Sequence, residues 1–275
     1  MYDSDLGSQI EEDKAARPMK KLRSNAPSTS TRASISGLDY DILQTISTHG
    51  KPAGSWTLHF VLREQGHTIS APTIGRRLRD LEIRGMLSPP TNGGRRLTRT
   101  GEELLKRTKE QRHIQISTEK LLSSLERNSR KDLIDLLVAR RAIEGAAAAL
   151  AAQNANTKSF SVLQKQIENQ RSAIFHGAMG VDEDVGFHEA LAQGTGNPVL
   201  ASIVHLLRSN PWLNQVVNAI RAKVGGRRIV DHEGILNAIR VGDSNLARQA
   251  MEQHLTNIIH DVEEYWGQVF GKSAK

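Results

Sequence analysis

The chain has 275 residues, no cysteine, and 37 Lys and Arg against 30 Asp and Glu, a net charge of +7. Its length favours two domains. The lack of cysteine excludes disulfides, thiolate metal sites and cysteine nucleophiles, and it fits the reducing cytoplasm, where we expect the protein to work. No apolar run approaches the roughly 18–20 residues that cross a bilayer, and the N-terminus carries no secretory signal, so we expect no membrane partner.

The positive charge is concentrated in the first part of the chain. Residues 1–116 hold 19 Lys and Arg against 13 Asp and Glu, a net +6, whereas residues 117–275 hold 18 against 17. Residues 71–101 alone carry seven arginines and two acidic residues. A focused basic patch is typical of phosphate binding, because neutralising phosphates releases condensed counterions. The alternative is a solvated basic face without a partner.

The first part of the chain predicts an arm followed by a winged helix. Residues 1–36 mix charged residues with Ser, Thr, Pro and Ala and lack the apolar content of a core, so we expect a flexible arm. Residues 37–101 predict a first helix that Gly50 ends, a short second helix capped by Ser55, and a third helix capped by Ser70.

The third helix and the segment after it predict the DNA contacts. An Asn-Gly turn at residues 92–93 lies between two short β segments, the second of them basic, which is typical of a hairpin. In a winged helix the third helix enters the major groove and the hairpin contacts the backbone. The alternative is a small α+β domain with an arginine-rich surface. The expected DNA-binding residues are Ser70, Thr73, Arg76, Arg77, Arg79, Arg95 and Arg96.

The rest of the chain predicts helices, so the fold class is mainly α. Residues 102–116 form a helical linker in this interpretation, with a helix from Glu102 to about Glu110, and residues 117–270 form an all-α domain without strand alternation. A helix over residues 133–152 places Arg140 in the middle of its apolar stripe. A buried arginine must be paired or must serve a cavity. Arg140 therefore either pairs with Glu144 or binds an anion, and both readings stay open.

Four inward polar residues predict one shared site. Asp184 and His188 lie one helical turn apart, and His232 and His254 each lie on the apolar side of their own helix. A single inward histidine is usually a satisfied core residue, but three of them with an aspartate fit one polar site in a bundle core. This set suits Zn²⁺, Ni²⁺ or Fe²⁺, and less readily Mn²⁺. Further candidates as ligands or supporting groups are His176, His205 and His260.

The second domain resembles the FCD ligand-binding domain of the FadR subfamily of GntR-type bacterial transcription regulators, over about residues 117–265. The resemblance rests on residues 138–144 with the Ala-rich turn after them, residues 184–191, Gly196-Asn197, and two histidine helices whose histidines are 22 residues apart. It implies that the metal ligands are Asp184, His188, His232 and His254 and that the effector-binding residues are Arg140 and Asn197. Asn197, which precedes Pro198, is equally suited to capping a helix.

The first domain departs from the usual GntR pattern. Pro52-Ala53-Gly54-Ser55 and residues 70–78 stand where that family has other residues, and this stretch is more similar to the winged helix of ribonuclease R-like proteins. Because of this departure, we do not infer an operator sequence from the GntR family. The departure does not weaken the prediction that the domain binds nucleic acid.

We therefore expect a cytoplasmic, homodimeric transcription regulator and not an enzyme. Its winged helix binds operator DNA, and its bundle binds a small carboxylate metabolite through a divalent metal ion. One alternative is a metal-dependent enzyme, for which Glu144 is the nearest candidate base. A second is an RNA-binding winged-helix protein. A third keeps the regulator but leaves the histidines hydrogen-bonded and free of metal.

Overall fold

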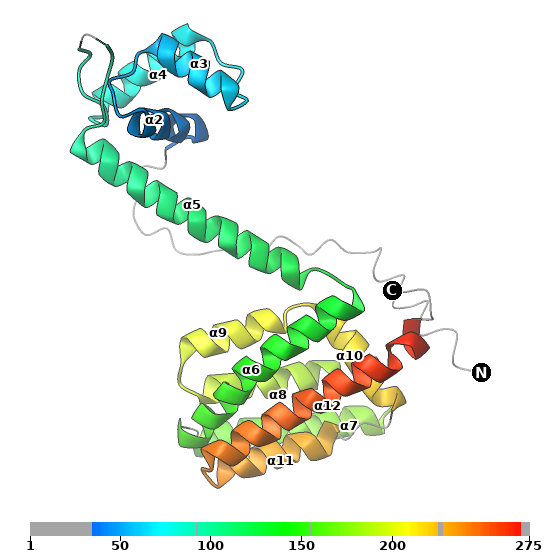
Figure 1. Cartoon of the computed structure of the whole chain (residues 1–275). Coiled ribbons are helices and arrows are strands. Elements are labelled where there is room, and N and C mark those ends of the chain that lie inside the picture. The colour runs from blue at the N-terminus through cyan, green and yellow to red at the C-terminus, as the bar shows by residue number, and fades with distance from the viewer. Residues whose placement is uncertain (1–34, 92, 155, 225–227, 271–275) are drawn as a thin grey trace. The chain divides into compact units, whose positions relative to one another are not determined.

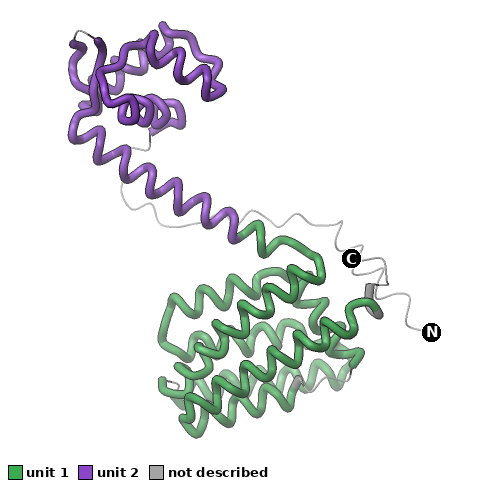
Figure 2. The backbone as a smooth tube through the Cα atoms, viewed as in Figure 1, with its two compact units in different colours: residues 1–22, 122–275 green, residues 23–121 purple. Residues whose placement is uncertain are grey.

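The computed structural model describes residues 35–91, 93–154, 156–224 and 228–270 (Figure 1). These residues fall into two compact units, one up to Leu121 and one from Leu122 onward (Figure 2). The expected mainly α class is confirmed, because the described residues contain helices and isolated β-bridges but no named strand. Apart from its last two residues, the flexible arm expected at residues 1–36 lies outside the described part.

Three helices form the core of the first unit: α2 (Gly37–His49), α3 (Ser55–Glu64) and α4 (Ala71–Ile83). Helix α2 ends at Gly50, whose φ of 67° is the left-handed conformation that glycine adopts without strain. Helix α4 begins as expected, because the side chain of Ser70 accepts a hydrogen bond from the backbone N–H of Thr73. The predicted cap of α3 is wrong by one residue: Gly54 is the extended cap, and Ser55 is already helical.

The segment after α4 folds back as a wing. Antiparallel bridges join Leu87 to Leu97 and Thr91 to Gly94, which is the expected hairpin in short form. Asn92 of the expected Asn-Gly turn lies outside the described residues. A further bridge joins Arg95 to Ala53, with two backbone hydrogen bonds of 3.0 Å, so the returning strand is fixed against the residues that precede α3.

Helix α5 (Arg99–Leu125) is longer than the predicted helix that ended near Glu110. Residues 111–125 contain neither Gly nor Pro, so nothing in the backbone chemistry stops the helix before Leu125. The two units divide inside this helix, between Leu121 and Leu122, and the predicted division at 116–117 falls in the same helix.

In its described residues, the second unit contains the end of α5 and seven further helices: α6 (Arg130–Asn154), α7 (Thr157–Phe175), α8 (Val181–Gly194), α9 (Pro198–Leu207), α10 (Pro211–Lys223), α11 (Arg228–Arg240) and α12 (Ser244–Phe270). The most extensive helix contact is between α6 and α12, and Figure 1 shows them side by side. Gly145 permits this approach, because a Cβ there would stand 2.9 Å from Cγ of Glu252.

Each unit has its own hydrophobic core. The first is built around residues such as Ile42, Leu58, Ile74, Leu78 and Leu81, and the second around Leu137, Leu163, Phe187, Ile235 and Met251. None of the described helices is long and apolar enough to cross a membrane.

Gly101→Ala tests the close packing between the wing and α5. A Cβ at Gly101 would stand 2.2 Å from the backbone oxygen of Met86, so the backbone must shift. We expect the free energy of unfolding of the first unit to fall by about 2–3 kcal/mol. Gly267→Ala is the control, because a Cβ there meets nothing within 4 Å, and this variant should gain about 0.5–1 kcal/mol. Denaturant unfolding of both variants measures the difference, and equal effects would contradict this account.

Candidate metal centre

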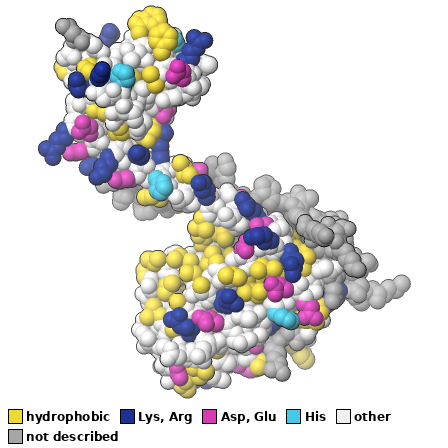
Figure 3. Space-filling view, in the orientation of Figure 1, with side chains coloured by type: hydrophobic (Ala, Val, Ile, Leu, Met, Phe, Trp, Pro, Cys, Tyr) yellow, Lys and Arg dark blue, Asp and Glu magenta, His cyan; other side chains and the backbone are white. Residues whose placement is uncertain are grey.

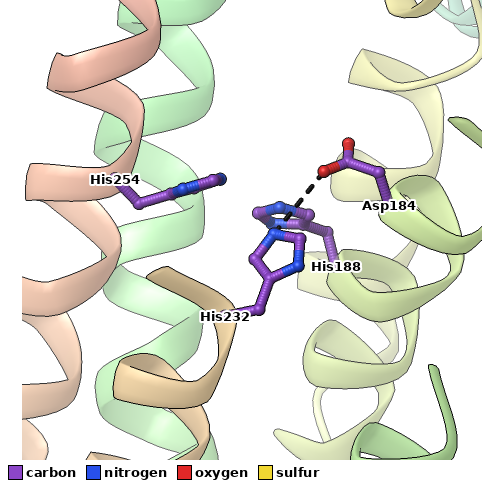
Figure 4. A group of neighbouring side chains, drawn as sticks. All are labelled: Asp184, His188, His232 and His254. Atoms are coloured by element: carbon purple, nitrogen blue, oxygen red, sulfur yellow. Dashed lines mark ion pairs between the residues drawn. The ribbon is translucent and has the colours of Figure 1, made fainter. Parts of the chain in front are cut away.

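Four side chains from three helices meet inside the second unit (Figure 4). Helix α8 contributes Asp184 and His188, α11 contributes His232, and α12 contributes His254. All four are buried, with exposed fractions of 7%, 1%, 0% and 2%. Each offers one ligand atom within 4.8 Å of the others, so the expected grouping of these residues is present in the fold.

Each of the three imidazoles has its Nδ1 against an oxygen of a neighbouring side chain. Two of these contacts are hydrogen bonds, and the third is a short contact whose angle falls outside hydrogen-bond geometry. The pairs are His232 with Oε1 of Gln170 at 2.9 Å, His254 with Oδ2 of Asp231 at 3.1 Å, and His188 with Oε2 of Glu144 at 2.5 Å.

The other nitrogen of each ring, Nε2, is buried and has no hydrogen-bond partner. A ring whose Nδ1–H faces an oxygen carries its lone pair on Nε2, which is the arrangement of a metal-ligating histidine with a supporting acceptor behind it. Oδ1 of Asp184 lies 3.5 Å from Nε2 of His232. Three Nε2 atoms without a hydrogen-bond partner thus converge with one carboxylate oxygen, and this donor set fits a divalent metal ion.

Glu144 connects this cluster to two buried arginines. Arg140 donates from Nε to Oε1 of Glu144 at 2.8 Å, and Arg208 donates from Nε and Nη2 to the two oxygens of Glu144 at 3.1 and 3.0 Å. Nη1 of Arg208 also donates to Oδ2 of Asp184 at 3.1 Å. Of the two readings of Arg140, the structure therefore contains the pair with Glu144, and anion binding stays a prediction.

The charges around the cluster move the pKa values in one consistent direction. Burial alone would raise the pKa of Glu144 and of Asp184, but the groups around them, with Arg208 the strongest, together outweigh burial and hold both pKa values below their usual range. Burial, with Arg208 nearby, lowers the pKa of His188 to about 4. Burial and His254 hold the pKa of His232 well below its usual value. His188 and His232 are therefore neutral near pH 7, as metal ligands must be.

A second ionic group supports His254 from behind. Asp231, which accepts from His254, also accepts from Nη2 of Arg221 at 2.9 Å, and Nη1 of Arg221 donates to Asp261 at 2.6 Å. Arg221 lies near the end of α10, Asp231 in α11 and Asp261 in α12. The orientation of this imidazole therefore depends on three helices at once.

The other histidine candidates do not join the cluster. His205 and His260 have side chains that are 73% and 71% exposed and lie against Glu189 and Glu264, and His176 is exposed beside the backbone oxygen of Ser172. Asn197 caps α9: its Oδ1 accepts from the backbone N–H groups of residues 199 and 200. The capping role is therefore present, and effector contact by Asn197 stays a prediction.

The expected DNA-binding residues lie in the first unit, on α4 and the wing. Arg76, Arg77, Arg79 and Arg96 are exposed, and no carboxylate of the described residues forms an ion pair with them. Arg95 differs, because its guanidinium binds Glu82 of α4 at 2.7 Å and is mostly covered. Ser70 and Thr73 are joined at the start of α4, where their hydroxyl oxygens lie 3.0 Å apart.

Sequence reasoning named Glu144 but missed other groups around the cluster, among them Gln170, Arg208 and Arg221. Gln170 had a signal, since it continues the buried positions Leu163 and Ile167 at helical spacing and is a polar residue in an apolar stripe. The sequence signal for Arg208 was weaker: it lies four residues after the buried Val204, but directly past the end of α9. The link from Asp231 through Arg221 joins different helices and has no signal in the spacing of either one.

The depressed histidine pKa values predict a pH dependence for the metal-free protein. A histidine of the unfolded chain takes up its proton near pH 6.5, whereas His188 does so only near pH 4. Between these values the unfolded state binds more protons, so the free energy of unfolding should fall as the pH drops through this window, by up to about 3 kcal/mol for this residue. Denaturant unfolding after chelator treatment measures the slope, and His188→Asn should reduce it. A wild-type stability independent of pH across the window would contradict the buried, neutral state.

Comparisons with known proteins match each of the two units separately. Residues 135–257 match the FCD domain, and residues 40–105 match the ribonuclease R winged-helix domain. The four clustered residues and both arginines lie inside the FCD match.

The curated proteins that are similar to this chain have names that describe them as regulators or repressors. The chain is 31% identical to the Uxu operon regulator of Haemophilus influenzae, over 47% of this chain and 53% of that protein. It is 34% identical to the HTH-type transcriptional repressor NanR of Klebsiella aerogenes, over 46% and 47%, and 28% identical to the HTH-type transcriptional regulator LutR of Bacillus subtilis, over 50% and 65%. The matches thus span about half the length of the first of these relatives.

Among solved structures, the chain is similar to Streptococcus agalactiae GntR, with a TM-score of 0.42 and 20% identity over 81% of this chain and 98% of that one. It is also similar to E. coli McbR/YncC, with a TM-score of 0.43 and 16% identity over 83% and 96%. The FCD match and the named relatives support a GntR-type regulator of the FadR branch, and residues 40–105 are similar to the winged helix of ribonuclease R.

Proposed function

We propose that the chain is a bacterial transcription regulator that binds operator DNA through its winged helix and a small carboxylate effector through a metal-containing helical domain. The observation that carries the proposal is the set of three buried, unpartnered Nε2 atoms beside Asp184. Leaving a buried polar atom unpaired costs about 1–3 kcal/mol, so three at one point favour a bound cation over a metal-free core. Zn²⁺, Ni²⁺ and Fe²⁺ suit the donor set best.

When bound, the metal supplies open coordination positions that a carboxylate oxygen can fill, because four protein ligands leave two positions of an octahedral ion. The charges nearby favour an anion as well. Arg140 and Arg208 are balanced by Glu144 and Asp184, so a divalent cation adds two positive charges to a buried site. An anionic effector would reduce this excess positive charge. Uncompensated charge is unfavourable in a buried site of low dielectric.

The arginines give the effector a way to act on the helices. Glu144 of α6 holds Arg140 on its own helix and Arg208 at the end of α9. An effector carboxylate that bound either guanidinium would compete with Glu144 and change the contact between α6 and α9. Such a change alters DNA binding only if the effector has different affinities for the DNA-competent and DNA-incompetent forms.

The main alternative, a metal-dependent enzyme, needs a general base beside the metal. Glu144 is the candidate base, but it receives hydrogen bonds from two arginines and its pKa is held well below the usual range. A base works best with a pKa near the working pH. Glu144 is therefore better suited to orienting His188 and the arginines, and the regulator is the function that the site supports better.

The winged helix supplies the DNA contact in this proposal. Arg76, Arg77 and Arg79 of α4 are exposed and free of described carboxylates, and Arg96 lies on the wing. The chain works as a cytoplasmic homodimer in this proposal, so two such helices read the two halves of a palindromic operator.

The metal assignment predicts that His254→Ala loses the ion, because it removes one of three nitrogen donors. We expect about one metal ion per wild-type chain and at least a tenfold weaker affinity in the variant. His260→Ala is the matched control, since it lies in the same helix with a side chain that is 71% exposed. Elemental analysis and titration of the chelated protein measure both. Equal metal content in the two variants would refute the site.

The DNA assignment predicts that replacing Arg76 and Arg77 by alanine weakens duplex binding at least tenfold and flattens its salt dependence, because fewer counterions are released. Arg248→Ala is the control, an exposed arginine on α12 of the other unit. Fluorescence anisotropy with fragments from upstream of the gene, at several salt concentrations, measures both effects. The DNA assignment fails if the double variant binds duplex like the wild type.

A further inference from the structure

A groove of about 380 Å³ opens in the first unit between α3 and α4, within the roughly 300–1,000 Å³ range of small-ligand pockets. Ser55 and Trp56 line it from the start of α3, Gly75 from α4, and Arg95 from the wing. Gly75 lines the groove without a side chain, and a Cβ there would be in van der Waals contact with Cβ of Ser55 on the facing helix, at 3.8 Å.

The groove is positively charged. Arg76 and Arg79 of α4 line it, both are exposed, and neither forms an ion pair with a carboxylate of the described residues. Arg95 on the opposite wall is held by Glu82 at 2.7 Å, so that acidic side chain is already used. The two guanidinium groups on α4 are therefore available to anions that enter the groove.

Trp56, which lines the groove, begins an aromatic row that continues along α3. Trp56 is 68% exposed and Phe60, one turn further, is 61% exposed, and Figure 3 shows a hydrophobic patch over α3. His59 lies between them, with its ring edge-on to Trp56 at 6.2 Å and tilted to Phe60 at 5.7 Å. Nδ1 of His59 lies 2.8 Å from the backbone oxygen of Ile69, and this hydrogen bond holds the imidazole in place between the two exposed rings.

We propose that this groove binds an unpaired nucleotide, with its base stacked on Trp56 and its flanking phosphates held by Arg76 and Arg79. A positive groove bordered by aromatic rings is how proteins bind single strands, because every unpaired base presents a flat π face. A base pair inside a duplex keeps its faces stacked on its neighbours and presents only its edges to a protein. Duplex binding explains the arginines but gives no role to the exposed rings.

The charge of the groove favours a nucleic acid over an apolar protein partner, since two free cations line the same cavity as Trp56. This inference rests on the nucleic-acid binding proposed above and adds a second kind of strand to it. The unpaired nucleotide can come from DNA or from RNA, which share the base and the phosphate that the groove recognises.

Fluorescence anisotropy of the full chain with three labelled probes tests the inference: a duplex, oligothymidine and oligouridine of equal length, at one salt concentration. We expect Trp56→Leu to weaken binding of at least one single strand by about 5- to 150-fold, the equivalent of about 1–3 kcal/mol of stacking, and to change duplex binding less than about threefold. Trp56→Phe should retain most of the single-strand affinity, because it keeps an aromatic ring. The single strand that binds more tightly, DNA or RNA, identifies the source of the unpaired nucleotide.

Two further variants separate the groove from a general effect. Gly75→Leu, which fills the groove and keeps every charge, should weaken single-strand binding as Trp56→Leu does. Phe175→Leu should change nothing, because Phe175 is an 85% exposed aromatic residue of the other unit. Single-strand binding should also quench tryptophan fluorescence in the wild type and not in Trp56→Leu.

The inference is overturned if the wild type binds neither single strand, if Trp56→Leu binds them as the wild type does, or if it loses duplex and single strand equally. Its failure is distinguishable from that of the proposed regulator. If the chain binds duplex but neither single strand, the proposed regulator is retained and the groove site is refuted. If it binds a single strand but no duplex, the groove site is retained and the proposed operator binding is refuted.

Discussion

The polar centre of the helical domain depends on one carboxylate, that of Glu144. It is 1% exposed, accepts hydrogen bonds from two buried arginines, and lies 2.5 Å from Nδ1 of His188. Without it, two guanidinium groups would be buried with only Asp184 to balance them, and breaking such a buried pair costs about 3–5 kcal/mol. With it, Asp184 and the three imidazoles can be held in a dry core with their donor atoms turned toward one another.

The same arrangement explains why the site is ready for a cation. An oxygen lies behind every imidazole, supplied by Gln170, Asp231 and Glu144, so ring orientation is set by side chains outside the four candidate ligands. These acceptors come from α7, α11 and α6, and the ligands come from α8, α11 and α12. Movement of any of these helices therefore changes the site, which is the property that a ligand-responsive domain needs.

The four candidate ligands could be predicted from the sequence because each lies on the apolar side of a helix, where periodicity reveals an inward polar residue. The i, i+4 pair of Arg140 and Glu144 could be predicted for the same reason. Arg208 could not, because its role comes from meeting Glu144 and Asp184 of two other helices. The extent of α5 and the cap of α3 were also mispredicted, since helix ends depend on which residue first takes the helical conformation, and local patterns fix that poorly.

X-ray absorption at the metal edge of the purified, metal-loaded chain tests the central claim most directly, because it reads the ligand atoms around the ion. The account predicts a first shell of nitrogen and oxygen only, with three imidazole nitrogens near 2.0–2.1 Å if the metal is zinc. Adding a small carboxylate should change the oxygen part of that shell and leave the imidazole part unchanged. A chain that takes up no divalent metal, or an ion without imidazole ligands, would contradict the account.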